Sequence, residues 1–98
     1  MAQPTVHIFL PSGTTAIPCL ATGTAFPSPG HVLVGMAYQI NNGPVNQFGT
    51  FIPSGGSWSF PLTTVDCPIV GANYLLTVYA GENSAEFGTD SVNFIRTS

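Results

Sequence analysis

Histidine and cysteine are the side chains in this sequence that most often hold metals or act as nucleophiles, and each occurs only twice. The imidazoles are His7 and His31, and the thiols are Cys19 and Cys67. A metal site needs several nitrogen, sulfur or oxygen ligands close together in space, and the spacing of the histidines supplies no second ligand for either. We expect His7 to point outward from a strand and His31 to lie in a loop, with no metal and no cofactor bound.

Three of the four carboxylates, Glu82, Glu86 and Asp90, crowd one short stretch. Carboxylates are preferred calcium ligands, but a calcium site also needs clustered Asp-x-Asp spacing and further oxygen donors. The stretch lacks both features, so we predict a solvated acidic hairpin rather than a calcium site.

Catalytic motifs are missing from the sequence. A hydrolase triad needs Ser, His and a carboxylate beside an oxyanion hole, and no Gly-x-Ser-x-Gly elbow occurs. No phosphate-binding loop occurs either. We therefore predict that the chain is not an enzyme.

Aromatic residues offer a different chemistry, the stacking of a sugar ring on an exposed face. The one tryptophan, Trp58, is in phase with Phe60 and Leu62 along a strand pattern, which predicts an inward, buried row. We predict that Trp58 belongs to the core. The remaining candidates for an exposed platform are Phe9, Phe48, Phe51, Tyr79 and Phe87.

Composition excludes some partners and favours a compartment. Only 5% of the residues are charged, Arg96 is the single cation and the net charge is −3, so a phosphate-backbone binder is excluded and no nucleic acid partner is expected. No apolar run reaches the length of a membrane span, so we expect no membrane insertion. A chain rich in Ser, Thr, Asn, Gly and Pro with a cysteine pair is typical of extracellular or cell-surface modules. Either Met1 starts the domain's own chain, or it is an expression start in front of a segment cut from a larger exported protein, and the composition favours the second.

The elements that must position these residues are all strands. Eleven glycines and nine prolines leave no window for an amphipathic helix. Alternation and turn residues predict seven strands, over 5–10, 17–25, 32–40, 45–52, 58–62, 73–81 and 91–96, in a single domain spanning 1–98. The central strand is 73–81, with Tyr74, Leu76, Val78 and Ala80 on one face. A tight turn with positive φ is expected around 41–44.

Seven short strands with turns every 8 to 12 residues predict an immunoglobulin-like two-sheet sandwich with Greek-key connections, with an up-and-down barrel as the alternative. In such a sandwich Tyr74 is expected to bond backbone just before the central strand. The loops around 26–31 and 81–89 are expected to lie at the same end. Their residues form a candidate binding tip, made of Phe26, His31, Glu82, Asn83 and Glu86.

Several segments carry a family resemblance: Tyr38-Gln39-Ile40-Asn41-Asn42-Gly43-Pro44, Trp58-Ser59-Phe60-Pro61-Leu62, Gly71-Ala72-Asn73-Tyr74-Leu75-Leu76-Thr77-Val78-Tyr79-Ala80 and Asp90-Ser91-Val92-Asn93-Phe94. The series resembles the bacterial Ig-like domains found in tandem in large secreted or surface proteins. The chain departs from their pattern in its cysteine pair and in Gly81-Glu82-Asn83, where such domains often place an Asp-rich turn. No calcium site is therefore carried over.

The cysteines are predicted to form a disulfide outside the usual position. In the standard immunoglobulin pattern the second cysteine lies in the central strand, where this chain has Leu76. Cys67 instead falls in the loop 63–72, which this topology places at the same end as Cys19. The alternative is two free thiols in a reducing compartment.

The resemblance and the composition together predict a non-catalytic module that acts as a spacer, presentation or adhesion domain of an extracellular modular protein. Its expected partners are neighbouring domains of the same chain and a surface protein or glycan ligand. The alternative is a carbohydrate- or ligand-binding module appended to a secreted enzyme, which requires an exposed aromatic platform.

Overall fold

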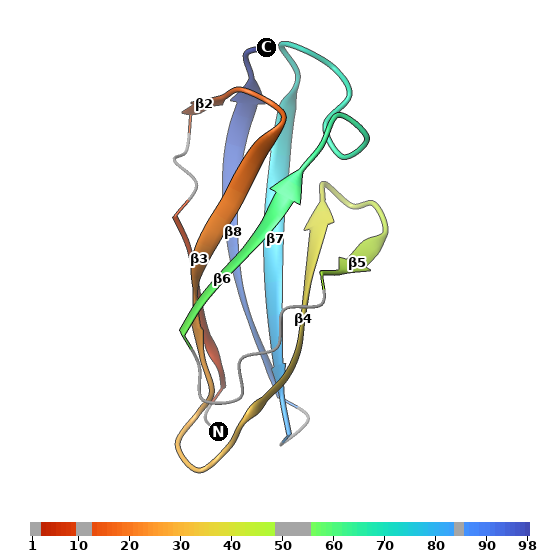
Figure 1. The fold of residues 1–98 in the computed structure, drawn as a ribbon. Coiled ribbons are helices and arrows are strands. Elements are labelled where there is room, and N and C mark those ends of the chain that lie inside the picture. Colours follow the sequence, from red (N-terminus) through yellow and green to blue (C-terminus); the bar gives the residue numbers. More distant parts are fainter. Residues whose placement is uncertain (1–2, 10–12, 49–55, 84–85) are drawn as a thin grey trace.

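The computed structural model describes residues 3–9, 13–48, 56–83 and 86–98. This part of the chain forms eight strands in two sheets and contains no helix that could cross a membrane (Figure 1). The strands are β1 (Thr5–Ile8), β2 (Gly13–Thr15), β3 (Cys19–Phe26), β4 (Leu33–Ile40), β5 (Val45–Gln47), β6 (Gly56–Leu62), β7 (Asn73–Glu82) and β8 (Phe87–Arg96). The predicted all-β, two-sheet architecture is confirmed.

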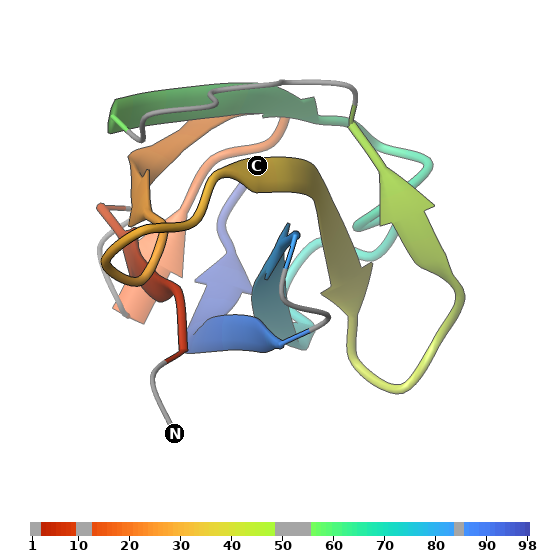
Figure 2. The same cartoon turned by 90° about the horizontal axis from the view of Figure 1, so that it is seen from below.

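The two sheets lie opposite each other (Figure 2), and buried side chains from both form one core. The smaller sheet has the order β1-β3-β6, and the larger has the order β2-β8-β7-β4-β5. The pairs described are antiparallel except β2 with β8, which run parallel. The chain therefore changes sheets between β1 and β2, and both sheets hold part of its N-terminal stretch.

Strand β7 lies at the centre of the larger sheet, between β8 and β4. Its sequence alternates, and a strand sends successive side chains to opposite faces. Tyr74, Leu76, Val78 and Ala80 are all buried, as predicted, while the residues between them are half-buried. The alternation continues to the end of the strand, so Glu82 also points inward.

Trp58 is a core residue, as predicted, with 2% of its surface exposed. It lies in β6 in phase with Phe60 and Leu62, which are also buried. Across the strand pair it faces Gly23, where an added Cβ would lie 2.4 Å from the indole ring. Glycine is therefore needed at position 23 because the indole occupies the space of a side chain.

The structure corrects several predicted strand bounds. Strand β2 was not predicted, and β8 begins at Phe87, where we expected a polar loop over 81–89 and a strand only from residue 91. The start of β8 lacks apolar alternation because its inward positions are Gly88, which packs against the Pro4 backbone, and Asp90, which accepts a hydrogen bond from the Ile8 N–H. Strands β1 and β5 end earlier than expected, at Ile8 and Gln47, and β3 begins later, at Cys19. Leu10 and residues 49–52 of the predicted strands lie outside the described residues.

Two predicted turn features are confirmed. The Tyr74 hydroxyl accepts a hydrogen bond of 2.8 Å from the Ile69 N–H in the loop before β7. Asn41 adopts a positive φ of 55° in the turn between β4 and β5. Both features lie at the ends of strands in the larger sheet, the first before β7 and the second after β4.

Candidate functional site

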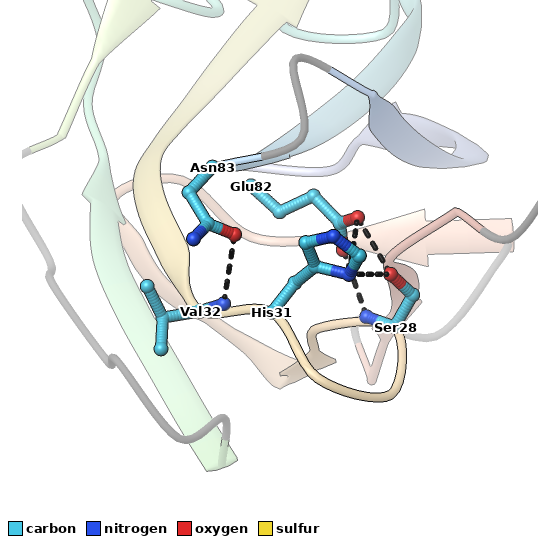
Figure 3. A network of polar contacts seen from close by, with 5 residues as sticks. All are labelled: Ser28, His31, Val32, Glu82 and Asn83. Atoms are coloured by element: carbon cyan, nitrogen blue, oxygen red, sulfur yellow. Dashed lines mark hydrogen bonds and ion pairs between the residues drawn. The ribbon is translucent and has the colours of Figure 1, made fainter.

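The candidate binding tip lies where the β3–β4 and β7–β8 connections meet. Phe26 ends β3, His31 lies in the following loop, and Glu82 ends β7. Figure 3 shows Ser28, His31 and Glu82 converging between these two connections. The expectation that the two loops share one end of the molecule is therefore confirmed.

Glu82 is buried inside the tip, with 0% of its side chain exposed. Its Oε1 accepts the Ser28 N–H at 2.8 Å, and its Oε2 accepts the Ser28 hydroxyl at 2.6 Å. Hydrogen bonds to both carboxyl oxygens offset the cost of removing this polar group from water. The predicted solvated acidic hairpin is therefore wrong at Glu82, which ties the two loops together.

His31 lies beside this carboxylate but remains partly exposed. Its Nδ1 is 3.0 Å from Ser28 Oγ and 3.7 Å from Glu82 Oε2, and 39% of its side chain is exposed. The single hydroxyl proton of Ser28 points to Glu82, so the hydroxyl oxygen is left to accept from an Nδ1–H. His31 is in a loop and His7 is exposed on β1, as predicted.

Ser, His and Glu meet here, but not in the order of a hydrolytic triad. In such a triad the imidazole lies between the hydroxyl and the carboxylate and takes the hydroxyl proton. Here the hydroxyl lies between the other two groups and donates to Glu82. Ser28 is also only 4% exposed, so its oxygen is a structural partner rather than an accessible nucleophile.

Asn83 joins the loops a second time. Its side-chain oxygen accepts the Val32 N–H at 3.1 Å, and its own backbone N–H donates to the Val32 carbonyl at 3.0 Å. Figure 3 draws the first of these bonds. Both bonds join the same two connections that Glu82 and Ser28 join. The tip is therefore held by backbone and side-chain bonds from both connections.

The other two acidic residues of the predicted cluster, Glu86 and Asp90, make different contacts. The Glu86 backbone carbonyl accepts the Glu82 N–H at 3.1 Å, and Glu86 is among the residues that line a separate hollow with Pro4 and Phe87. Asp90 accepts the Ile8 N–H at 2.9 Å. Among the described residues, no group of three or more His, Cys, Asp or Glu side chains is placed to hold a metal ion.

The outer side of the tip is an apolar hollow of about 410 Å³. The β3–β4 connection lines it, from Phe26 to Val32, and both of these residues are substantially exposed. Of the predicted tip residues, only Phe26 and His31 line this hollow, because Glu82 is buried behind it. Ser28 is the residue that sequence reasoning missed, although its position between two prolines and three residues before His31 was visible.

The aromatic candidates for a platform separate into three groups. Phe48 packs against Trp58 and Phe60, with ring centroids 5.8 Å and 4.6 Å apart, so it belongs to the core edge. Phe9 makes an edge contact with His7, and Phe51 lies outside the described residues. Among the candidates that the structure describes, only Tyr79 and Phe87 pair with each other, with ring centroids 6.1 Å apart.

The predicted Cys19–Cys67 disulfide is not formed, and both thiols are free. The topology brings them to the same end, as expected, because Cys19 pairs with Leu62 and Cys67 follows the turn after β6. Burial, then the nearby Asp66 and Cys19, raise the pKa of the Cys67 thiol to about 11, against a smaller lowering by Arg96. Burial also raises the pKa of Cys19. The thiolate is the form that reacts to form a disulfide, so these surroundings favour two protonated thiols.

No protein-family model and no curated protein matches the sequence. Among solved structures, the fold is similar to part of the endo-beta-1,4-mannanase from Thermotoga petrophila, with a TM-score of 0.75 and 12% sequence identity. The match covers 100% of this chain and 20% of the mannanase chain. It shows a shared β fold, and this chain spans about a fifth of the length of that enzyme.

Proposed function

We propose that the chain is a non-catalytic, immunoglobulin-like module that spaces or presents neighbouring domains of an extracellular modular protein. The observation that carries this proposal is the path of the chain through an elongated sandwich. Strand β1 begins at Thr5, opposite Phe26 at the tip, and β8 ends at Arg96 at the opposite end (Figure 1). The long axis measures 43 Å, against 22 and 20 Å across it. A module entered at one end and left at the other suits a head-to-tail array.

The end of the molecule beside Arg96 also suits contact with a neighbouring domain. The Arg96 side chain donates to the Cys67 carbonyl, and its own carbonyl accepts the Gly71 N–H. The loop from Cys67 to Gly71 contains two exposed apolar residues, Ile69 at 62% and Val70 at 58%. Val65, which precedes this loop, is 86% exposed. Apolar side chains exposed together suit contact with another domain, and Ile69 and Val70 lie in the loop that bonds Arg96 near the end of β8.

The strand order supports the immunoglobulin-like assignment. Strands β1, β3 and β6 correspond to A, B and E of one sheet, and β8, β7 and β4 to G, F and C of the other. The Tyr74 contact with Ile69 resembles the tyrosine corner of that fold. The similarity to a fifth of a mannanase chain supports the view that this fold serves as one part of a longer polypeptide.

The spacing role is tested by placing the chain between a donor and an acceptor fluorescent protein. We expect a single narrow distribution of energy-transfer efficiency, because a folded module fixes the separation of its ends along the 43 Å axis. The same fusion in denaturant is the control. A native distribution as broad as the denatured one would contradict the proposal, and so would release of reducing sugars from polysaccharides by the purified chain.

A second candidate function is a carbohydrate-binding module appended to a secreted enzyme. The paired rings of Tyr79 and Phe87 favour it, and a similar fold forms part of a mannanase. It is tested by electrophoresis through native gels that contain a soluble galactomannan, hydroxyethyl cellulose or xylan. Retardation by at least one of these neutral polysaccharides is the expected result, and unchanged mobility in all three would remove this candidate.

A further inference from the structure

The outer face of the larger sheet carries a mixed set of aromatic and hydrogen-bonding side chains. The register places residues of β4, β7 and β8 in rows across this face, including Gln39 with Thr77 and Ser91, and Tyr79 with Thr89. The next row contains Gly35, Gly81 and Phe87. These rows alternate with the buried positions, so their side chains point away from the core.

Among the described residues of β4, β7 and β8, none that points to this face is charged. The residues of β4, β7 and β8 that point outward are odd-numbered, from Gly35 to Gln39, from Asn73 to Gly81 and from Phe87 to Ile95. The charged residues of these strands, Glu82, Asp90 and Arg96, lie at the alternate positions. A neutral face offers no attraction to a polyanion or to a charged peptide, and it suits a neutral partner rich in hydroxyl groups.

The Tyr79 ring on this face is held by a chain of two hydrogen bonds. The Tyr79 hydroxyl donates to Gln39 Oε1 at 2.8 Å, and Gln39 Nε2 donates to the Gly43 carbonyl at 2.9 Å. The neighbouring Phe87 ring is tilted by 53° to that of Tyr79, and 57% of Phe87 is exposed. A side chain that is already ordered loses less conformational entropy when a ligand binds.

The backbone beside the rings is uncovered. Gly35 and Gly81 pair with each other across β4 and β7, and Gly81 pairs with Phe87 on the other side. A Cβ added at Gly35 would meet nothing within 4 Å, and one added at Gly81 would meet only the Gly35 carbonyl, at 3.9 Å. A flat ring can therefore lie against the sheet next to Tyr79 and Phe87 without a side chain in the way.

We infer that this outer face binds a neutral polysaccharide. Tyr79 and Phe87 stack on the apolar faces of its pyranose rings, and the hydroxyl and amide groups of Thr77, Ser91 and Gln39 bind its hydroxyls. A pyranose ring has an apolar face and a polar rim, which this arrangement of rings and neutral hydrogen-bonding groups complements. The inference rests on the second candidate function above and gives it a ligand class and a binding surface.

The experiment compares the wild-type chain with three variants in the same galactomannan, hydroxyethyl cellulose and xylan gels, followed by calorimetric titration. Phe87→Ala removes an exposed ring of the pair, and Gly35→Leu covers the open backbone without touching either ring. Phe9→Ala is the matched control, because Phe9 is 54% exposed and lies beside β1 of the other sheet. Thermal unfolding of each variant verifies that it is folded.

We expect the wild type and Phe9→Ala to bind with equal affinity. We expect Phe87→Ala and Gly35→Leu to lower the affinity about tenfold or more, as loss of an aromatic anchor does at binding surfaces. Binding by the wild type that both face variants retain would overturn this surface while leaving a carbohydrate-binding function in place. Failure of the wild type to bind any of the three polymers would overturn both. Self-association that Phe87→Ala abolishes would instead identify the face as a contact between copies of the chain.

Discussion

At the scale of single residues, Gly23 of β3 leaves the space that the Trp58 ring of β6 occupies. A Cβ at this position would lie 2.1 Å from the His7 carbonyl oxygen and 2.4 Å from the Trp58 ring. We predict that Gly23→Ala destabilises the fold by about 1 to 3 kcal/mol or more, as overpacking does. Gly35→Ala is the matched control because its Cβ meets open space. Urea denaturation of both variants measures the difference, and equal midpoints would contradict the prediction.

Glu82 links the two connections of the tip through Ser28. Its two carboxylate oxygens each accept one hydrogen bond from Ser28, and a glutamine offers only one acceptor oxygen in the same volume. One Ser28 donor would then face an NH₂ group. We predict that Glu82→Gln lowers the free energy of unfolding by about 1 to 3 kcal/mol, the usual cost of leaving a buried donor without an acceptor.

Denaturant unfolding at neutral pH measures this effect. Glu86→Gln serves as the control because the Glu86 contact with Glu82 is made by its backbone carbonyl, which the substitution keeps. A Glu82→Gln protein as stable as the Glu86→Gln protein would show that the buried carboxylate does not stabilise the tip.

At the scale of elements, the turn between β6 and β7 joins the two sheets through Asp66. This carboxylate accepts the Thr63 N–H at 2.9 Å and the Tyr38 hydroxyl from β4 at 2.8 Å. Burial, followed by the hydrogen bond to Asp66, raises the pKa of Tyr38 to about 12 from 10.0. The folded state therefore holds this proton more tightly than the unfolded state does.

A raised pKa in the folded state gives stability that is fully present below pH 10 and is lost as the pH rises toward 12. We predict that the melting temperature of the wild type falls across this window, and that Tyr38→Phe removes part of the fall. Tyr79→Phe is the control, since its hydroxyl bonds the neutral Gln39. Identical pH slopes for the wild type and Tyr38→Phe would contradict the prediction.

The same turn protects a thiol. Cys67 is fully buried and its pKa is raised to about 11, whereas Cys19 is partly exposed. We predict that iodoacetamide at pH 8 labels Cys19 of the native protein faster than Cys67, and that both are labelled in denaturant without reductant. Intact mass and peptide mapping follow the two sites. Absence of any label in non-reducing denaturant would mean that the purified protein carries the disulfide instead.

The sequence pattern predicted the elements whose apolar residues alternate. The inward rows of β7 and β6 followed from period two alone, and the Tyr74 contact followed from the expected fold. The start of β8 was missed because Gly88 and Asp90 replace apolar residues at its inward positions, where the backbone of Pro4 and the Ile8 N–H are the partners. Those partners lie more than 80 positions away, and local patterning carries no signal for them.

The sequence predicted where the residues of the candidate tip lie, but it did not predict the hydrogen bonds that they make. Loop ends that share one end of a sandwich follow from topology, so the tip was anticipated. The burial of Glu82 was missed because its charge suggested solvent, although it continues the inward series of Tyr74, Leu76, Val78 and Ala80. The partner that makes this burial possible, Ser28, lies 54 positions away in another connection.

At the scale of the whole molecule, the parallel pairing of β2 with β8 determines how the sandwich resists tension. The two strands run in the same direction, with Gly13 beside Phe94 and Thr15 beside Arg96, and the Thr97 N–H extends the pair to the Thr15 carbonyl. A pull on the two ends of the chain draws β2 toward the tip and β8 away from it, so the hydrogen bonds between them are sheared together rather than opened one at a time.

We predict a distinct rupture peak when the molecule is stretched from its ends in an atomic force microscope, and a lower peak for Thr14→Pro, which places a residue without an N–H in β2. A chain that extends without a peak would show that the β2–β8 pair carries little of the load.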